Sequence, residues 1–373
     1  MKNGLNQQQE EAVRHTEGPL LILAGAGAGK TRVITHRILH LIKKGVAPSS
    51  ILAVTFTNKA AREMSERVET LLSEDKDLNR PLSFRERPYV STFHSLGVHV
   101  LRENSQSLDL SRHFTIFDRS DSLRGIKQAI KEAGYDPQQF EPRRILGTIS
   151  KQKGDAISRG EYEGLHHDEY YPSLVAEVWE KYENILHQDK ALDFDDLLLK
   201  TVALFKDNKE LLRKYQGVWN YIHIDEYQDT NKVQNDLAKL LAEKHHNICV
   251  VGDIDQTIYT WRGANISNLL HFEKTFPDTH TVVLEENYRS TKNIIEASNT
   301  IIKKNIERPE KHLFTNNEVG EKLSLYGAYD EIDEASFVAE KSKALIKNGV
   351  MPKEIAVLYR ANFQSRILEE LFL

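Results

Sequence analysis

The stretch LLILAGAGAGKT (residues 20–31) decides the fold. Its first five residues are apolar and predict a buried strand, and the glycines that follow at alternate positions predict a loop whose backbone N–H groups can face an anion. The next residues, RVITHRILHLIKK (32–44), repeat apolar side chains at helical spacing, from Val33 and Ile34 to Ile42. A strand, a glycine-rich loop and a helix in this order predict a phosphate-binding loop.

The loop departs from the common pattern G-x-x-x-x-G-K-[ST] at its first position, where Ala24 replaces glycine. That position ends the strand, and alanine is acceptable there if its φ is negative. We expect the backbone of the loop to bind phosphates, Lys30 to reach the β and γ phosphates, and Thr31 to hold Mg²⁺. A flexible alanine/glycine turn is the weaker alternative, because a strand precedes the loop and a helix follows it. The predicted nucleotide-binding residues of the loop are Ala24, Gly25, Ala26, Gly27, Ala28, Gly29, Lys30 and Thr31.

Further short apolar runs alternate with helical patterns along the chain. They are ILAVTF (51–56), NYIHID (220–225), ICVVGD (248–253), TVVLE (281–285) and EIAVLYR (354–360). Continuous apolar runs of this length are typical of strands buried on both faces, as in a parallel sheet. After residue 56, Thr57 is expected to cap a helix with Ala60, Ala61, Met64 and Val68 on one face. The pattern predicts an α/β fold with helices on both faces of a parallel sheet.

Composition excludes several classes of protein. The chain has 373 residues, enough for two or three domains, with 40% apolar and 28% charged residues. These values are typical of a soluble globular protein, and neither a membrane span nor a signal peptide is predicted. A single cysteine, Cys249, favours a reducing, cytoplasmic location. The net charge of -5 argues weakly against a protein coated with nucleic acid, although a local basic groove remains compatible with it.

Residues 115–190 differ from the rest because helical patterns dominate and no apolar run of comparable strength occurs. We interpret this segment as a helical insertion. Its stretch RRILGTISKQKG (143–154) carries Arg143, Arg144, Lys151 and Lys153, which either contact a nucleic-acid backbone or form an ordinary solvated face.

An acidic pair follows another predicted strand in YIHIDEYQD (221–229). We expect Asp225 to bind Mg²⁺ and Glu226 to polarise the attacking water. An isolated acidic pair is usually a solvated surface, but ligands of a doubly wound sheet bind outside the carboxyl ends of its strands.

The segment VVGDIDQTIYTWRGA (250–264) also follows a predicted strand. Gln256 is a candidate γ-phosphate contact, while Tyr259, Trp261 and Arg262 form an aromatic and cationic cluster. Other aromatic residues at strand ends are Phe56, the pair Phe93 and His94, and Phe194. Together they predict a track on which the bases of a single strand stack, although any one of them alone is more typical of a core residue.

Seven segments in order closely resemble the UvrD/Rep/PcrA-like DNA helicases of superfamily 1A: AGAGAGKT, TFTNKAAREM, STFHSL, DFDDLL, DEYQD, GDIDQTIYTWRGA and LEENYRS. The resemblance spans nearly the whole chain, from residue 5 to residue 366. It implies RecA-like motor domains that hydrolyse ATP, move 3′ to 5′ along single-stranded DNA and separate the duplex at single-strand/double-strand junctions. Repair or replication proteins are the implied partners, and a monomer is the implied state.

The resemblance also implies a domain order and residue roles. Residues 1–114 and 191–286 would form the first motor domain, 115–190 the helical insertion domain, and 287–373 the start of a second motor domain. Gln8 would read the adenine, with Arg32 and Tyr288 packed around the base. Arg289 would act as an arginine finger beside the catalytic Glu226, Lys30 and Gln256, whereas Arg37 has no assignable motif role. The implied DNA contacts are Thr55, Phe56, Asn58, Thr92, Phe93, His94, Phe194, Tyr259, Trp261 and Arg262.

Two departures from the family pattern are present. Ala28 stands where the family usually has serine, with a modest expected effect because the loop backbone makes most phosphate contacts. The later motifs of the second motor domain are not found, so we expect the N-terminal part of a longer helicase, with impaired activity by itself. Two alternatives stay open: a fragment that binds ATP or single-stranded DNA without unwinding, and a P-loop ATPase unrelated to nucleic acid.

Overall fold

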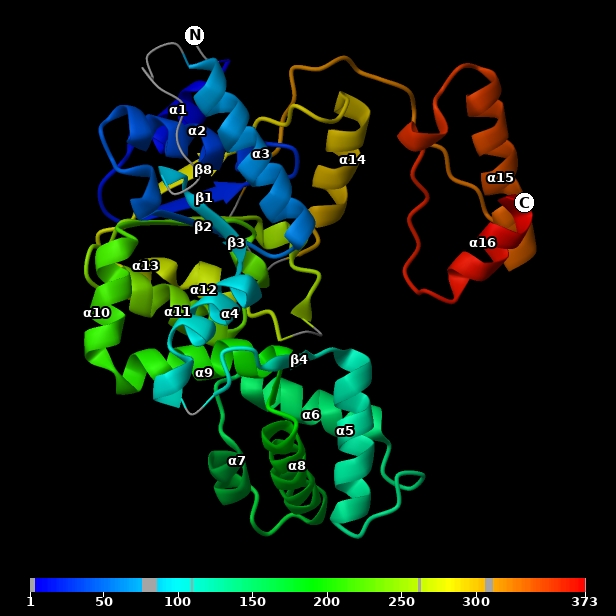
Figure 1. Ribbon diagram of the computed structural model, residues 1–373. Coiled ribbons are helices and arrows are strands. Elements are labelled where there is room, and N and C mark those ends of the chain that lie inside the picture. The colour runs from blue at the N-terminus through cyan, green and yellow to red at the C-terminus, as the bar shows by residue number, and fades with distance from the viewer. Residues whose placement is uncertain (1–3, 76–85, 109, 261–262, 306–310, 373) are drawn as a thin grey trace. The chain divides into compact units, whose positions relative to one another are not determined.

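Five of the predicted strands join one parallel sheet in the computed structural model, which describes residues 4–75, 86–108, 110–260, 263–305 and 311–372 (Figure 1). A sixth strand, β3, also belongs to this sheet, and each neighbouring pair is parallel. The strand order is β3 (Tyr89–Thr92), β2 (Ile51–Thr55), β6 (Tyr221–Ile224), β7 (Ile248–Gly252), β1 (Leu20–Ala24) and β8 (His280–Leu284). The predicted α/β class is confirmed.

Helices cover both faces of the sheet, because the apolar side chains of its strands alternate between two cores. Leu20 and Ile22 of β1 face one core, whereas Leu21 faces the other. The first core is shared with α1 (Gln7–Arg14), α2 (Lys30–Lys43) and α3 (Asn58–Glu74). The second is shared with α4 (Phe93–Glu103), α9 (Phe194–Asp207), α10 (Lys209–Val218), α11 (Lys232–Ala242), α12 (Ser267–Leu270) and α13 (Phe272–Thr275). Figure 1 shows the two sets of helices on opposite sides of the strands.

The predicted helix signals around the first two strands are confirmed. The Thr57 hydroxyl accepts a hydrogen bond from the Ala60 amide, 3.1 Å away, and caps α3. Met64 and Val68 are the buried residues of that helix. In α2, the predicted apolar face is buried against the sheet.

The helical segment has a core of its own. It contains α5 (Arg119–Glu132), α6 (Pro142–Gly154), α7 (Arg159–Leu165) and α8 (Tyr170–Gln188), packed around Trp179 and Tyr182. Two short strands, β4 (Thr115–Phe117) and β5 (Ala191–Asp193), pair in parallel where the chain enters and leaves this segment. Three-residue strands carry too little periodicity to be recognised in the sequence, and neither was predicted.

Contacts divide the chain into two units, Met1–Glu318 and Val319–Leu373, and each is described by itself. The first unit also contains α14 (Lys292–Ile302), and the second contains α15 (Glu331–Lys347) and α16 (Gln364–Phe372). The predicted strand at 354–360 is wrong, because Pro352–Glu354 is a 3₁₀ turn and residues 355–359 are irregular. A strand needs a hydrogen-bonded neighbour, and the described residues after 318 include no strand. Leu358 is accordingly 93% exposed.

No helix among the described residues is both long enough and apolar enough to traverse a lipid bilayer.

Arg37 of α2 and His223 of β6 are buried basic side chains. Arg37 of α2 donates hydrogen bonds to the carbonyl oxygens of Ala12, His15 and Thr16, and so ties the C-terminal end of α1 to α2. His223, in the middle of β6, is 1% exposed. Burial, reinforced by the charge of Arg37, lowers the pKa of His223 to about 3.

This histidine should make the fold sensitive to acid. The unfolded chain binds a proton on His223 below about pH 6.5 and the native protein does not, so stability is lost as the pH falls. His223→Val, which keeps a strand-forming apolar residue, should flatten this dependence by about 2 kcal/mol between pH 7 and pH 5. Urea unfolding at the two pH values measures the difference. The same substitution at the exposed His113 is the control, and equal pH profiles for wild type and His223→Val would contradict the prediction.

Candidate nucleotide and nucleic-acid sites

The glycine-rich loop connects β1 to α2. Gly27 and Gly29 have φ values of 69° and 83°, in the left-handed region that favours glycine. The described non-glycine residues with positive φ do not include Ala24 or Ala28, so both alanines keep ordinary backbone. The first N–H groups of α2 have no acceptor within the helix, and with the loop they form an end whose chemistry suits an anion.

Three successive carbonyl groups of the loop are held from outside it. Gln9 Nε2 donates to the Ala28 oxygen at 2.9 Å, and Asn287 Nδ2 donates to the Ala26 oxygen at 2.6 Å. The Tyr288 amide donates to the Gly27 oxygen at 3.0 Å. These bonds fix the orientation of the peptide planes, so the loop needs little rearrangement to bind an anion.

The lysine and threonine of the loop contact the acidic pair after β6. Lys30 Nζ donates to Glu226 Oε2 at 2.6 Å, and Thr31 Oγ1 donates to Asp225 Oδ2 at 3.2 Å. The structure therefore brings together four of the predicted residues at the carboxyl ends of β1 and β6.

The acidic pair combines an unfavourable backbone conformation at Glu226 with a buried carboxylate at Asp225. Glu226 adopts a left-handed conformation with a φ of 53°, which costs on the order of 1 kcal/mol for a residue other than glycine. Asp225 is 4% exposed, and burial followed by the charge of Glu226 raises its pKa to about 6, although Lys30 opposes the shift. Unfavourable backbone and buried charge at one place are typical of functional sites.

Gln228 links the acidic pair to the segment after β7. Its Nε2 donates to Glu226 Oε2 at 2.8 Å, and its Oε1 accepts from the Asp253 amide at 3.0 Å. Asp253 in turn accepts a hydrogen bond from Gln256 Nε2 at 2.6 Å and an ion pair from Lys311. Asp253 and Gln228 therefore connect the predicted phosphate contact Gln256 to Glu226.

The glutamines of α1 occupy different environments. Gln8 is exposed, whereas Gln9 is 1% exposed and holds the loop. Asn6 caps α1 and forms a reciprocal capping box with Gln9, which places Gln9 on the loop side. The spacing Asn6-x-x-Gln9 is the signal that could have identified this residue from sequence.

The other residues predicted around the nucleotide lie near the same end of α1. Tyr288 is 44% exposed, and its hydroxyl donates to Glu286 Oε2, which also accepts from Asn6. Burial followed by this hydrogen bond raises the pKa of Tyr288 to about 12. Arg32 and Arg289 are exposed, and the Arg289 Cβ lies 2.9 Å from where a side chain at Gly27 would begin.

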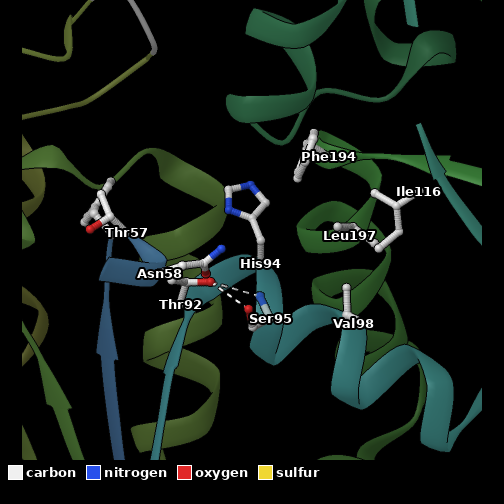
Figure 2. Close-up of a pocket in the computed structure, with 10 residues that line it drawn as sticks. Thr57, Asn58, Thr92, His94, Ser95, Val98, Ile116, Phe194 and Leu197 are labelled. Atoms are coloured by element: carbon white, nitrogen blue, oxygen red, sulfur yellow. Dashed lines mark hydrogen bonds between the residues drawn. The ribbon is translucent and has the colours of Figure 1, made fainter. Parts of the chain in front are cut away.

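A second site lies at the carboxyl ends of β2 and β3. It is a pocket of about 520 Å³ between these strand ends and α9 (Figure 2). His94 projects between the two walls, and its ring meets the ring of Phe194 edge to face at 5.6 Å. The lining residues are Phe56, Thr57, Asn58, Thr92, His94, Ser95, Val98, Ile116, Phe194 and Leu197.

Some predicted DNA contacts are not placed in this pocket. Phe93 is 2% exposed and belongs to the core, where it packs against Phe56, and Thr55 is 1% exposed. Tyr259 is half-buried, and its backbone amide hydrogen-bonds Asp229. The predicted contacts Trp261 and Arg262 lie outside the described residues.

Both alternatives for Lys153, a nucleic-acid backbone contact and a solvated face, are wrong. Its side chain is 1% exposed and bound by the carboxylates of Asp193 and Asp196, so it cannot reach a phosphate. Arg143, Arg144 and Lys151, from the same helix, are exposed.

Sequence reasoning assigned no role to several residues of the network: Gln9, Gln228, Asn287 and Lys311. Lys311 and Asn287 lie far along the chain from the acids and the loop that they contact, so no local pattern reveals these contacts. Gln228 stands within the quoted DEYQD segment, and its contact with Glu226 is local, but its contact with Asp253 depends on the position of β7 beside β6.

The side chains present suit Mg²⁺ bound together with a nucleotide. The Thr31 hydroxyl and the Asp225 carboxylate are hard oxygen ligands 3.2 Å apart. The described residues contain no group of three or more His, Cys, Asp or Glu side chains suited to a metal ion. One or two protein ligands are sufficient for Mg²⁺ when phosphate oxygens and water complete its octahedral shell.

Two family descriptions match the chain. Residues 5–277 match the UvrD/REP helicase N-terminal domain, and residues 282–373 match the UvrD-like helicase C-terminal domain.

Curated relatives match over the whole chain. The chain is 48% identical over 372 residues to the ATP-dependent DNA helicase PcrA of Staphylococcus aureus (strain Mu50), covering 100% of this chain and 50% of that protein. It is also 48% identical over 373 residues to the ATP-dependent DNA helicase PcrA of Bacillus subtilis (strain 168), covering 100% of this chain and 49% of that protein. The chain thus spans about half the length of the curated relatives that it matches.

The two glutamines of α1 offer a matched test of what holds the loop. Gln9→Ala should destabilise the protein by about 1–3 kcal/mol, because it leaves the Ala28 carbonyl without its buried donor. Gln8→Ala, at an exposed position one residue away, should change stability by less than about 0.5 kcal/mol. Denaturant unfolding measures both changes, and equal effects of the two substitutions would refute the asymmetry.

Proposed function

We propose, because this chain belongs to the UvrD/REP helicase family, that it forms the nucleotide- and single-strand-binding part of an ATP-dependent DNA helicase. We propose that the helicase moves 3′ to 5′. The observation that carries the proposal is the position of two sites on one edge of the parallel sheet. The glycine loop and acidic pair follow β1 and β6, and the aromatic pocket follows β2 and β3. Nucleotide-driven movement at this edge can therefore reach both sites.

The nucleotide would bind as its Mg²⁺ complex. The loop amides and Lys30 would hold the β and γ phosphates, and Thr31 with Asp225 would ligate the metal. Mg²⁺ would neutralise the charge that develops on the phosphate oxygens. The oxygen of Thr31 and the carboxylate of Asp225 are already adjacent, which supports this arrangement.

Glu226 would act as the general base. Its carboxylate accepts hydrogen bonds from Lys30 and Gln228. When Lys30 turns to the phosphates, Glu226 can accept a proton from the attacking water. The water oxygen then bonds to the γ-phosphorus, and the bond to the bridging oxygen of the leaving diphosphate breaks. We assign Gln256 to the γ-phosphate and Arg289 as an arginine finger, the latter supported by its position beside Gly27.

We place the adenine near the N-terminal end of α1. Gln9 suits its recognition better than the predicted Gln8, because Gln9 lies against the loop while Gln8 faces solvent. Arg32 and Tyr288 would pack around the base, since both side chains are exposed and the charge of Arg32 lies near the Tyr288 hydroxyl.

The aromatic pocket would bind single-stranded DNA. Bases stack on aromatic side chains without regard to sequence, and His94 and Phe194 offer two rings at one opening. Asn58 and Thr92 supply polar groups beside them. Burial lowers the pKa of His94, so this ring stays uncharged at neutral pH and serves as a stacking surface.

We also propose the domain order stated above, with residues 1–114 and 191–286 as the first motor domain, 115–190 as the insertion domain and 287–373 as the start of the second. A junction of single- and double-stranded DNA would be the substrate, and repair or replication proteins would be partners of a cytoplasmic monomer. The buried, unpaired Cys249 agrees with a reducing compartment.

Lys30→Ala tests the nucleotide site. It should weaken Mg²⁺-dependent binding of a fluorescent ATP analogue by at least about tenfold, because a charge-assisted phosphate contact is lost, and it should abolish oligo(dT)-stimulated hydrolysis. Lys43→Ala, at an exposed end of the same helix, is the control. Binding without hydrolysis in the wild type would favour the non-unwinding fragment, and hydrolysis indifferent to oligo(dT) would favour an unrelated ATPase.

His94→Ala tests the pocket. It should weaken binding of fluorescent oligo(dT) by about five- to fiftyfold, the range expected when a stacking ring is removed. Tyr170→Ala removes a ring that is 71% exposed on the helical segment and should leave the affinity unchanged. Fluorescence anisotropy measures both, and unchanged affinity in His94→Ala would exclude the pocket as a base-stacking site.

A further inference from the structure

The buried ammonium of Lys153 joins the helical segment to the aromatic pocket. Lys153 stands near the end of α6, and its Nζ lies 2.8 Å from Asp193 Oδ2 and 2.8 Å from Asp196 Oδ1. The side chains of these three residues are 1%, 5% and 9% exposed. The ion cluster formed by Lys153, Asp193 and Asp196 is thus closed to solvent.

The two carboxylates flank the residue that forms one wall of the pocket. Asp193 ends β5 and caps α9, where its Oδ1 accepts from the Asp196 amide at 2.8 Å. Phe194 is the first residue of α9, and 48% of its surface is exposed. Its ring meets His94 within the pocket lining (Figure 2). Lys153 therefore binds the junction between β5 and α9 through carboxylates on either side of Phe194.

The charge of Lys153 is permanent. Burial by itself would lower the pKa of Lys153, but Asp193 and Asp196 raise it above its usual value. Around the cluster lie the ring of Tyr182, 5.7 Å from Nζ, and the carboxyl groups of Asp195 and Glu183. Removal of this one cation would leave several carboxylates facing one another in the interior, and the β5–α9 junction could not keep its present geometry.

The same end of α6 reaches the segment that follows the acidic pair. Lys232 Nζ donates to the Asp155 carbonyl at 3.2 Å. A side chain at Gly154 would come within 3.3 Å of Asn231, the cap of α11. The end of α6 thus lies between the β5–α9 junction and the start of α11, which restricts how far that junction can shift.

We propose that Lys153 is a positioning residue for the single-strand pocket: through Asp193 and Asp196 it fixes the orientation in which Phe194 faces His94. This inference rests on the proposed function of the pocket. A stacking ring contributes more to the free energy of binding if it is already held in place, because ordering the ring on binding costs conformational entropy. Lys153 meets that requirement from another layer of the fold, without touching DNA.

The decisive variant replaces the ion cluster with neutral groups of similar size, Lys153→Met with Asp193→Asn and Asp196→Asn. Asparagine caps a helix about as well as aspartate, and neutral replacements of buried ion pairs are often tolerated. Affinity for fluorescent oligo(dT) should fall about five- to tenfold, while binding of an ATP analogue without DNA should stay within about twofold of the wild type. Asp196→Asn alone, which keeps the cap and one ionic bond, should give a smaller loss in the same direction and decides the question if the triple variant does not fold.

A mutant cycle with Phe194→Ala separates positioning from general stability. Once Phe194 is absent, the neutral triple variant should weaken oligo(dT) binding by less than about twofold more. Arg124→Met removes a cation whose ion-pair partner, Asp121, lies on the same helix of the helical segment, and it should leave affinity unchanged. Wild-type affinity in the neutral variants, or an equal loss with and without Phe194, would overturn the inference. Failure of the wild type to bind oligo(dT) would instead overturn the proposed function of the pocket.

Discussion

Both faces of the six-stranded sheet are buried, so charged side chains can reach solvent or a ligand only at the ends of the strands. This constraint decides where chemistry occurs in the molecule. Because every strand runs in the same direction, all carboxyl ends meet at one edge, and the helices that follow begin there with unpaired N–H groups. The glycine loop, the acidic pair, the Asp253 segment and the aromatic pocket all lie along that edge.

Arg37 and Lys153 are buried cations that are satisfied in different ways. Arg37 has three backbone carbonyl acceptors and serves to join two helices, whereas Lys153 has two carboxylates and serves to hold the β5–α9 junction. The planar guanidinium group suits several dispersed acceptors, and the compact ammonium group suits converging charges. Because both cations are enclosed, neither can bind a ligand. The basic residues of α6 that can contact solvent or nucleic acid are the exposed Arg143, Arg144 and Lys151.

The sequence predicted the elements that depend on local patterns and missed those that depend on distant partners. Apolar runs predict five strands of the sheet, and the glycine or acidic residues directly after two of these runs predict the loop and the acidic pair. The strand expected at 354–360 has the same apolar pattern but no neighbour to pair with in its unit. Phe93 and His94 are adjacent in sequence and have opposite fates, because the first turn of α4 directs one to the core and the other to the pocket. Both interpretations of Lys153, a nucleic-acid contact or a solvated face, placed it at the surface, since a lysine in a basic stretch carries no sign that two aspartates some forty residues later will enclose it.

The three bonds to the loop carbonyls have a consequence for how binding capacity arises as the chain folds. Their donors stand at positions 9, 287 and 288, so the loop acquires its final shape only when segments almost three hundred residues apart have met. Contacts of such long sequence separation form late, since closing a long loop costs entropy before the contact repays it. The twelve residues that signal the fold therefore do not fix the shape of the loop by themselves. That shape is a property of the assembled unit, because residues 287 and 288 supply two of the three donors to its carbonyl groups.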